Sequence, residues 1–161
     1  MRRLALSLLL AAAMPAAAAD FVPVRQISLE LARDIATHAV DACRRDGYNV
    51  SAVVVDRAGD VQVALRDTLA PRYTLEISTR KAGMVIMSGI DSAEFRASRG
   101  DIRPELNHVQ GLIVMDGGVP IRAAGSLVGA LGVSGAPGGD KDAACAAAAI
   151  KAVEERLEFA P

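Results

Sequence analysis

The sequence predicts an α+β domain in which a five-stranded antiparallel sheet is flanked by helices. Two groups of short β-branched runs, within residues 50–66 and 109–133, are separated by a segment whose apolar residues recur at helical spacing. Helical patterns also precede the first group and follow the second. Helices between two groups of strands indicate an α+β layer arrangement.

The first 19 residues have the pattern of a secretory signal peptide. A basic start, an apolar run over residues 4–14 and small residues at 17–19 fit cleavage before Asp20. The apolar run is shorter than the roughly 20 residues that a membrane-spanning helix needs. We therefore expect a periplasmic or secreted protein whose single domain, residues 20–161, has no membrane span after cleavage.

The charge of the chain argues against nucleic-acid binding. It has 18 basic and 19 acidic residues, and loss of Arg2 and Arg3 with the leader makes the remaining domain more acidic. Nucleic-acid-binding domains usually carry a basic patch. The length suits one domain with a proper core, and an apolar composition without Trp is compatible with an oligomer interface.

Two cysteines, Cys43 and Cys145, each lie inside an expected helix. In an oxidising compartment they can pair if the two helices are neighbours, but the pairing depends on a geometry that the sequence does not contain. Two buried free thiols are the alternative that we prefer. The absence of a C-x-x-C motif or Cys/His cluster argues against a structural zinc site.

The first part of the domain is expected to form a helix and a β-hairpin. Ser28 can cap a helix that ends before Gly47. The run at 50–56 then indicates a strand, 57–60 a tight turn, and the alternating run at 61–66 the partner strand.

The middle of the chain is expected to be mainly helical. Residues 73–88 form a helix in which Gly83 costs about 1 kcal/mol relative to Ala, unless close packing needs the missing side chain. Residues 92–99 suggest a short further helix. We expect residues 100–107 to be a polar surface loop, since Pro104 interrupts regular structure.

The last part is expected to form a meander and a final helix. Three strands, at 112–115, 120–124 and 127–133, are joined by tight turns. With the first hairpin they make five strands. Asp140 can cap a helix from residue 141 to about residue 157.

The glycine-rich loop 135–139 leads into this last helix. Free amides at a helix N-terminus favour anions, but the loop has neither a P-loop nor a G-x-G-x-x-G pattern, so we do not expect a nucleotide site. Alternatively, Gly129, Gly132 and Gly135 permit close packing of the strand or of a subunit interface. Both explanations can hold together.

The segment at 117–150, GGVPIRAAGSLVGALGVSGAPGGDKDAACAAAAI, resembles the signature of the GlcG/HbpS family of haem-binding-type domains. The segments DRAGDVQVALRD (56–67) and TLEISTRKA (74–82) are similar to the family's first hairpin and following helix. One departure is the string RDTLA (66–70), where many members have an Arg-Met-Asp-Gly-Ala-like string, so this chain lacks the Gly.

The resemblance implies a five-stranded antiparallel sheet flanked by helices, assembled into homo-oligomers. It also implies binding of a tetrapyrrole, haem first and corrinoid second, as in the related C-terminal domain of PduO-type proteins. The role would be sequestration, delivery or sensing of haem.

Haem requires an axial donor, an apolar slot and cations for its propionates. His108 lies directly before an expected strand, and we favour it as the metal ligand. His38, in the middle of a helix, is the second histidine, and either one can equally be an ordinary surface residue. Other donors are Met84, Met87, Met115, Tyr73, Thr74 and Ser78.

Lys81 is the preferred propionate partner. It adjoins Arg80, and adjacent helical residues point about 100° apart, so at most one of them faces a given pocket. The alternative is a solvated pair on the helix surface. The remaining candidates for cofactor binding are Arg122, Gly135 and Gly138.

Two other functions stay open. One is an enzyme or binding protein for a small organic acid such as glycolate, suggested by family members encoded near glycolate genes and by the glycine-rich anion corner. The other is a cofactor-free periplasmic protein-interaction module. The sequence offers no defensible catalytic set, so we do not favour an enzyme.

Overall fold

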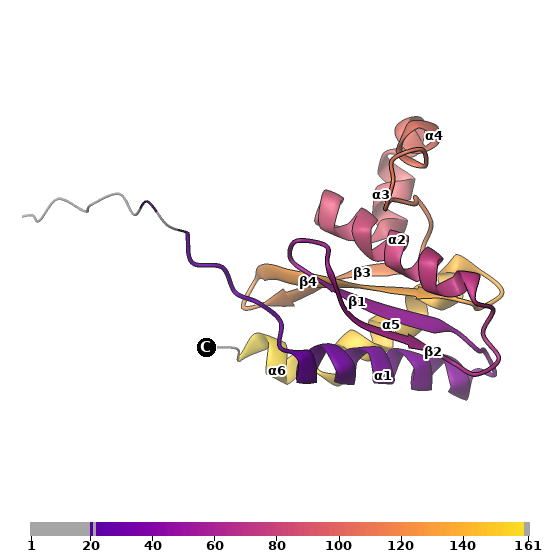
Figure 1. The fold of residues 1–161 in the computed structure, drawn as a ribbon, viewed down its shortest axis with the longest axis horizontal. Helices are drawn as coiled ribbons and strands as arrows, with labels where there is room; N and C mark the ends of the chain where they lie inside the picture. Colours follow the sequence, from indigo (N-terminus) through magenta and orange to yellow (C-terminus); the bar gives the residue numbers. More distant parts are fainter. Residues whose placement is uncertain (1–19, 21, 160–161) are drawn as a thin grey trace, which may run out of the picture.

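The computed structural model of this chain describes residue 20 and residues 22–159, and the expected leader at 1–19 lies outside them. In the described part, helices lie on both faces of one four-stranded sheet (Figure 1). The elements are α1 (Leu29–Arg45), β1 (Ser51–Asp56), β2 (Val61–Arg66), α2 (Tyr73–Ser88), α3 (Ser92–Ser98), a 3-10 turn (Gly100–Ile102), α4 (Arg103–Leu106), β3 (Gly118–Ala123), β4 (Ser126–Ser134), α5 (Gly139–Ala152) and α6 (Glu154–Glu158).

The sheet is antiparallel throughout, with the strand order β2-β1-β4-β3. The α+β class is therefore confirmed, but the prediction of five strands is wrong. Residues 112–115 form no strand, because side chains occupy their backbone groups: Arg80 Nε donates to Leu112 O, and Val114 N donates to Asn107 Oδ1. Backbone groups satisfied by side chains need no strand partner.

Alternating side chains of the central strands face two different helical layers. Ala52 and Val54 of β1 pack in the core beneath α1 and α5, whereas Val53 and Val55 pack against α2. Figure 1 shows α1, α5 and α6 on one face of the sheet and α2, α3 and α4 on the other. Because both faces are covered, β1 is an almost continuous buried run.

α1 forms as predicted from its cap. Ser28 Oγ accepts a hydrogen bond from Leu31 N at 3.2 Å, and Ile35 and Ala39 lie on the buried face. α1 packs alongside α5 and is covalently joined to it by the Cys43–Cys145 disulfide, with a Cα–Cα distance of 5.4 Å. The preference for two free thiols is therefore wrong, since the fold brings together two helices that are far apart in sequence.

Close approach of α2 to the sheet depends on glycines. A side chain at Gly132 would collide with Ser78 O, and one at Gly118 would come within 2.6 Å of Lys81 O, both in the backbone of α2. The interpretation of Gly132 as a close-packing residue is thus confirmed. Helix α2 ends at Gly89, which adopts the left-handed conformation (φ 74°).

A buried ion pair connects the two helical layers past the end of β4. Lys81 Nζ of α2 lies 2.7 Å from Asp142 Oδ2 of α5 and donates to Val133 O at 2.8 Å. Asp142 Oδ1 accepts from Ala136 N, and the two side chains are 0% and 5% exposed. Gly117, with φ 111°, leaves the space that the pair fills.

Two further local predictions are wrong. The expected loop at 100–107 contains the 3-10 turn and α4, because Pro104 occupies the first turn of a helix, where its missing N–H has no intrahelical acceptor. The final helix has Gly138 at its N-cap, so Asp140 lies inside the first turn, and it is interrupted at Val153 between α5 and α6.

The RDTLA string at 66–70 is held by side chains in place of a glycine turn. Asp67 accepts from Arg44 Nε at 2.7 Å and from Thr68 N at 2.7 Å, and Arg66 donates to Ala70 O. The hydrogen bond from Arg44 holds the pKa of Asp67 below its ordinary value. Among the described residues, no helix is long and apolar enough to cross a membrane.

Removal of the disulfide should lower the free energy of unfolding by about 2–5 kcal/mol. The bond closes a loop with a sequence separation of 102, so the double variant Cys43→Ser, Cys145→Ser gains chain entropy when it unfolds. Denaturant titration of the oxidised protein and of the double variant measures the difference, and reduced wild type serves as the control. Equal midpoints for oxidised wild type and the double variant would contradict this.

Breaking the buried ion pair should cost more than breaking an exposed one. Lys81→Met leaves a buried carboxylate without its cation and should lower the free energy of unfolding by about 3–5 kcal/mol. Arg99→Ala, which breaks an exposed pair with Asp101, is the matched control and should cost about 1 kcal/mol or less. A similar loss in both variants, measured by denaturant unfolding, would show that the Lys81–Asp142 pair is not the stronger constraint.

Candidate functional site

The best-supported site is built around residues 107–114, which connect α4 to the segment before β3 and which we call the His108 loop. Its two ends are joined, since Asn107 Oδ1 accepts a hydrogen bond from Val114 N at 2.8 Å. His108 and Val109 follow Asn107 and are exposed. The loop therefore presents an imidazole and an apolar side chain from a closed backbone.

α2 contacts the His108 loop through Arg80 and Gly83. Arg80 Nε donates to Leu112 O at 3.0 Å, and Arg80 Nη2 donates to Asn107 O at 3.3 Å. Gly83, three residues later on the same helix face, lies under Gly111, and a Cβ on Gly83 would approach Gly111 O to 2.5 Å. The cost of a glycine inside α2 is thus explained by the close packing of this loop.

One surface hollow borders the His108 loop, a second borders Met115, the residue that follows it, and His108 is not among the lining residues of either. One, of about 460 Å³, lies between the loop and α2 and is lined by Glu76, Thr79, Arg80, Gln110 and Gly111. The other, of about 400 Å³, lies on the side of α3 and α5 and is lined by Arg96, Arg103, Met115, Asp116, Gly139 and Asp140. Both are open surface depressions and differ in this from clefts that bury most of a bound ligand.

The second hollow contains cationic and apolar groups suited to an amphipathic ligand. Arg96 makes two short hydrogen bonds to Asp116, Nε–Oδ1 at 2.7 Å and Nη2–Oδ2 at 2.6 Å, and these bonds raise the pKa of Arg96. Arg103 on α4 is exposed, and Met115 has 37% of its surface exposed. An apolar ring with a carboxylate arm could contact Met115 and the guanidinium of Arg103 together.

The glycine-rich corner borders this hollow at Gly139. Gly138 is the N-cap of α5, and Gly135 (φ 135°) lies against Asn49 O, which leaves no room for a side chain there. Asp140 and Asp142 stand in the first turn of α5, and they oppose an anion there. Burial raises the pKa of Asp142, although the neighbouring Lys81 acts in the opposite direction.

The structure separates the other predicted site residues. Lys81 is fully buried in its ion pair with Asp142, so its ammonium group does not reach the surface. His38 is exposed on α1, across the sheet from the helices that carry His108, so the two histidines do not share a site within one chain (Figure 1). Arg122 lies on β3 and donates to Gly89 O at 2.6 Å and to Gly125 O at 3.3 Å.

Sequence reasoning missed Arg96 and Arg103. Both lie within residues 92–107, for which the sequence predicts a short helix and a polar loop. Neither prediction indicates that these two side chains lie near Met115 and the start of α5. The placement of Pro104 in the first turn of a helix was the available signal. It would have placed Arg103 on a helix close to His108.

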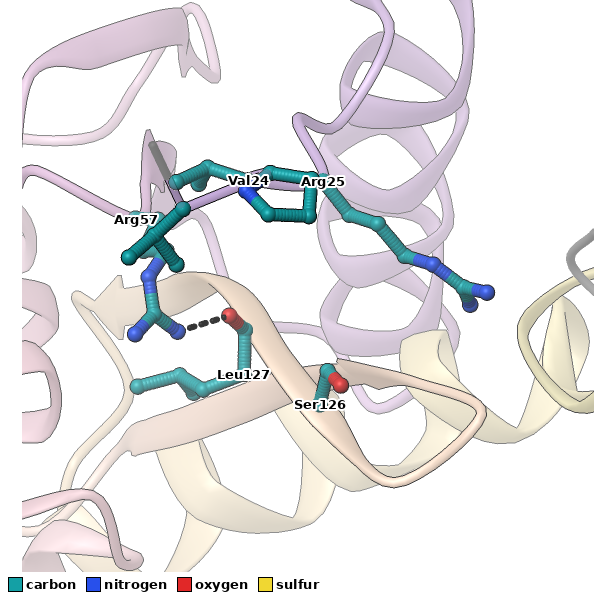
Figure 2. A pocket seen from close by; sticks show the side chains of 7 residues that line it. Val24, Arg25, Arg57, Ser126 and Leu127 are labelled. Carbon is teal, nitrogen blue, oxygen red and sulfur yellow. Dashed lines mark hydrogen bonds between the residues drawn. The ribbon is translucent and has the colours of Figure 1, made fainter. Parts of the chain in front are cut away.

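Three other hollows fit a tetrapyrrole less well. The one in Figure 2 lies between the N-terminal segment with Val24 and Arg25 and the start of β4, where Leu127 O accepts a hydrogen bond from Arg57 at 2.8 Å. It measures only about 220 Å³, and a hollow beside the end of α1 measures about 180 Å³. A larger hollow, of about 470 Å³, lies along β3, and its lining residues come from segments that carry neither histidine, whereas Gln110 and Gly111 of the first hollow belong to the His108 loop.

Donor chemistry therefore favours the His108 loop as a haem site. The loop carries one exposed imidazole and the exposed apolar side chain of Val109, while Met115 and the guanidinium of Arg103 line the hollow next to its end. These are the three kinds of group that haem requires. In the described part of the chain, no cluster of three or more His, Cys, Asp or Glu residues could hold a bare metal ion.

Solved structures of similar sequence share this fold. The crystal structure of HbpS is 34% identical with a TM-score of 0.78, and the match covers 87% of this chain and 99% of that chain. A double mutant of Streptomyces reticuli HbpS is 35% identical with a TM-score of 0.77, over 88% of this chain and 98% of that chain.

A third solved structure, PduOC in complex with heme, shares the fold at 24% identity and a TM-score of 0.70, over 80% of this chain and 95% of that chain. The comparison with curated proteins gives no match. The family model described as "Haem degrading protein HbpS-like" matches residues 27–151. The chain therefore belongs to the HbpS-like family.

Proposed function

We propose that this chain is an exported haem-binding protein that holds haem against the His108 loop. The observation that carries the proposal is membership of a family described as haem degrading, together with an exposed histidine on a loop whose residues Gln110 and Gly111 line a surface hollow. The haem complex of PduOC adds support, because a protein of the same fold is named there with that ligand.

His108 is the proposed axial ligand. Imidazole is a common axial donor to haem iron, and His108 is exposed at the start of a loop whose ends are tied together. Val109, which is 47% exposed, and Met115 offer apolar contacts for the macrocycle. The hollow beside His38, which is lined by Thr37 and Val40, measures only about 180 Å³.

Arg103 is the proposed partner of a propionate. It lines the hollow of about 400 Å³ and presents an exposed guanidinium group, which can bind a carboxylate in a two-pronged geometry, whereas Nε and Nη2 of Arg96 in the same hollow are already bound to Asp116. Lys81 is replaced in this role because its ammonium group is buried against Asp142. Bound haem would supply the redox chemistry, and the side chains named here would bind and orient it and shield one face from water.

Two biological roles follow from haem binding, and both are proposals. Sequestration, delivery or sensing of haem needs only reversible binding, whereas the family description also favours degradation of the bound haem. Assembly into a homo-oligomer and binding of corrinoid, both expected from the family resemblance, stay predictions.

Export is supported by the disulfide. Cys43 and Cys145 are paired, and structural disulfides persist mainly in oxidising compartments such as the periplasm. The leader pattern in the first 19 residues points in the same direction. The two observations are independent, because one rests on the fold and the other on the N-terminal sequence.

Titration of the purified haem-free protein with haemin should give a saturable shift of the Soret band at one haem per site. His108→Ala should abolish the shift or weaken binding by at least about tenfold, since removing the axial donor removes the iron–protein bond. His38→Ala is the matched control, an exposed helical histidine on the opposite face, and should bind as wild type does.

The same titration separates the alternatives. No saturable shift in wild type would refute haem binding, and loss of binding in His38→Ala alone would move the axial ligand to α1. Gradual loss of the Soret band when a reductant and molecular oxygen are both supplied would favour degradation over storage, since oxidative ring opening needs both electrons and an oxidant. Thermal stabilisation by glycolate or a similar acid, but not by haemin, would favour the organic-acid alternative.

Export predicts a mature N-terminus at Asp20. Intact-mass and N-terminal analysis of the protein recovered from a periplasmic fraction should show loss of the first 19 residues. As a control, a variant with large residues in place of Ala17 and Ala19 should not be cleaved, because the cleavage site requires small residues at these positions. Recovery of the chain from the cytoplasm with Met1 still present would contradict export.

A further inference from the structure

We propose that Arg80 is a positioning residue of the haem site, which acts by fixing the His108 loop and not by holding a propionate. The inference rests on the proposed function, because positioning matters only if His108 binds a ligand. It assigns Arg80 a task different from that of Arg103, although each of the two lines a surface hollow in this part of the molecule.

The guanidinium of Arg80 bridges the two sides of the exposed part of the loop. Its Nε donates to Leu112 O at 3.0 Å and its Nη2 donates to Asn107 O at 3.3 Å. These two carbonyls bracket the exposed residues 108–111. A planar fork can hold two acceptors at once, whereas the single ammonium of a lysine is a point charge without that geometry.

Little of this guanidinium remains for a ligand. Nη1 faces Glu76 Oε1 at 3.7 Å, so each of the three nitrogens of Arg80 has an acceptor nearby. The side chain is only 27% exposed. The carboxylate of Glu76 also offsets the charge that would attract a propionate.

Two other contacts fix the same loop and show that its position is built into the fold. Asn107 Oδ1 accepts from Val114 N at 2.8 Å, which closes the loop. Gly83 lets Gly111 O lie close to α2, and Gly111 adopts φ 85°, a conformation that favours glycine. The loop therefore rests on one rigid helix through Arg80 and Gly83, one turn apart.

A fixed loop defines where the imidazole can meet the iron. Groups that orient a metal ligand without touching the metal typically change affinity ten- to a hundredfold when they are removed. Arg80 is in that position, because it contacts the carbonyl of Asn107, the residue next to His108. The charge of Arg80 is not what the site uses.

The test compares Arg80→Lys with Arg80→Gln, because Lys keeps the charge and loses the fork. Haem affinity and the axial-ligand signature in the absorption and EPR spectra are measured by haemin titration. Both variants should bind about ten- to a hundredfold more weakly than wild type and shift toward the spectrum of His108→Ala. Added imidazole should restore the histidine-like spectrum in both, since it supplies the misplaced donor.

Two further variants serve as controls. Arg99→Gln removes an exposed guanidinium that lines neither hollow, and it should match wild type in affinity and spectrum. Asn107→Ala removes the hydrogen bond from Val114 N to Asn107 Oδ1, which joins the two ends of the loop, and it leaves the side chains of α2 unchanged. It should reproduce the effect of the Arg80 variants. This second route keeps the test decisive if an Arg80 variant does not fold, as judged by circular dichroism.

A measurement without haem separates this inference from the proposed function. Amide hydrogen exchange over residues 107–114 should be faster in both Arg80 variants and unchanged in Arg99→Gln. Wild type that takes up no haem would refute the proposed function and with it the haem role of Arg80. Wild-type affinity in Arg80→Lys with weak binding in Arg80→Gln, or unchanged exchange in both, would overturn the positioning role alone.

Discussion

The ion pair between Lys81 and Asp142 joins helical layers that lie on opposite faces of the sheet. With almost no exposed surface, its two charges must be satisfied inside the protein, and Val133 O and Ala136 N complete that set. A buried charge without a partner is costly, so the start of α5 and the middle of α2 are constrained to meet at this point. The glycine at position 117 is part of the same constraint.

α2 transmits this constraint to the proposed site. Its inner face lies directly on Gly132 and Gly118 of the sheet, and its outer face carries the His108 loop through Arg80 and Gly83. Lys81 and Arg80 are adjacent, so they point in different directions around the helix and serve different ends. One anchors α2 to α5, and the other holds the loop.

The opposite layer is fixed by a covalent bond. The disulfide between Cys43 and Cys145 joins α1 to α5, and α5 also carries Asp142. Both helical layers are thus tied to a single helix whose first turn borders the hollow with Arg96 and Arg103. A rigid frame of this kind suits a family associated with haem, because the frame keeps ligand-binding loops in place on its surface.

Local sequence patterns by themselves determined α1 with its Ser28 cap, the β1–β2 hairpin, the bounds of α2 and the resemblance to the HbpS-like family, because caps, turns and periodicity depend on neighbouring residues. Only the tertiary structure decided the disulfide, the missing fifth strand and the burial of Lys81. Each depends on residues distant in sequence. Cys43 and Lys81 have their partners on α5, and the segment that forms no strand is bound by Arg80 of α2. A sequence pattern describes a residue's neighbours along the chain, whereas these features are set by its neighbours in space.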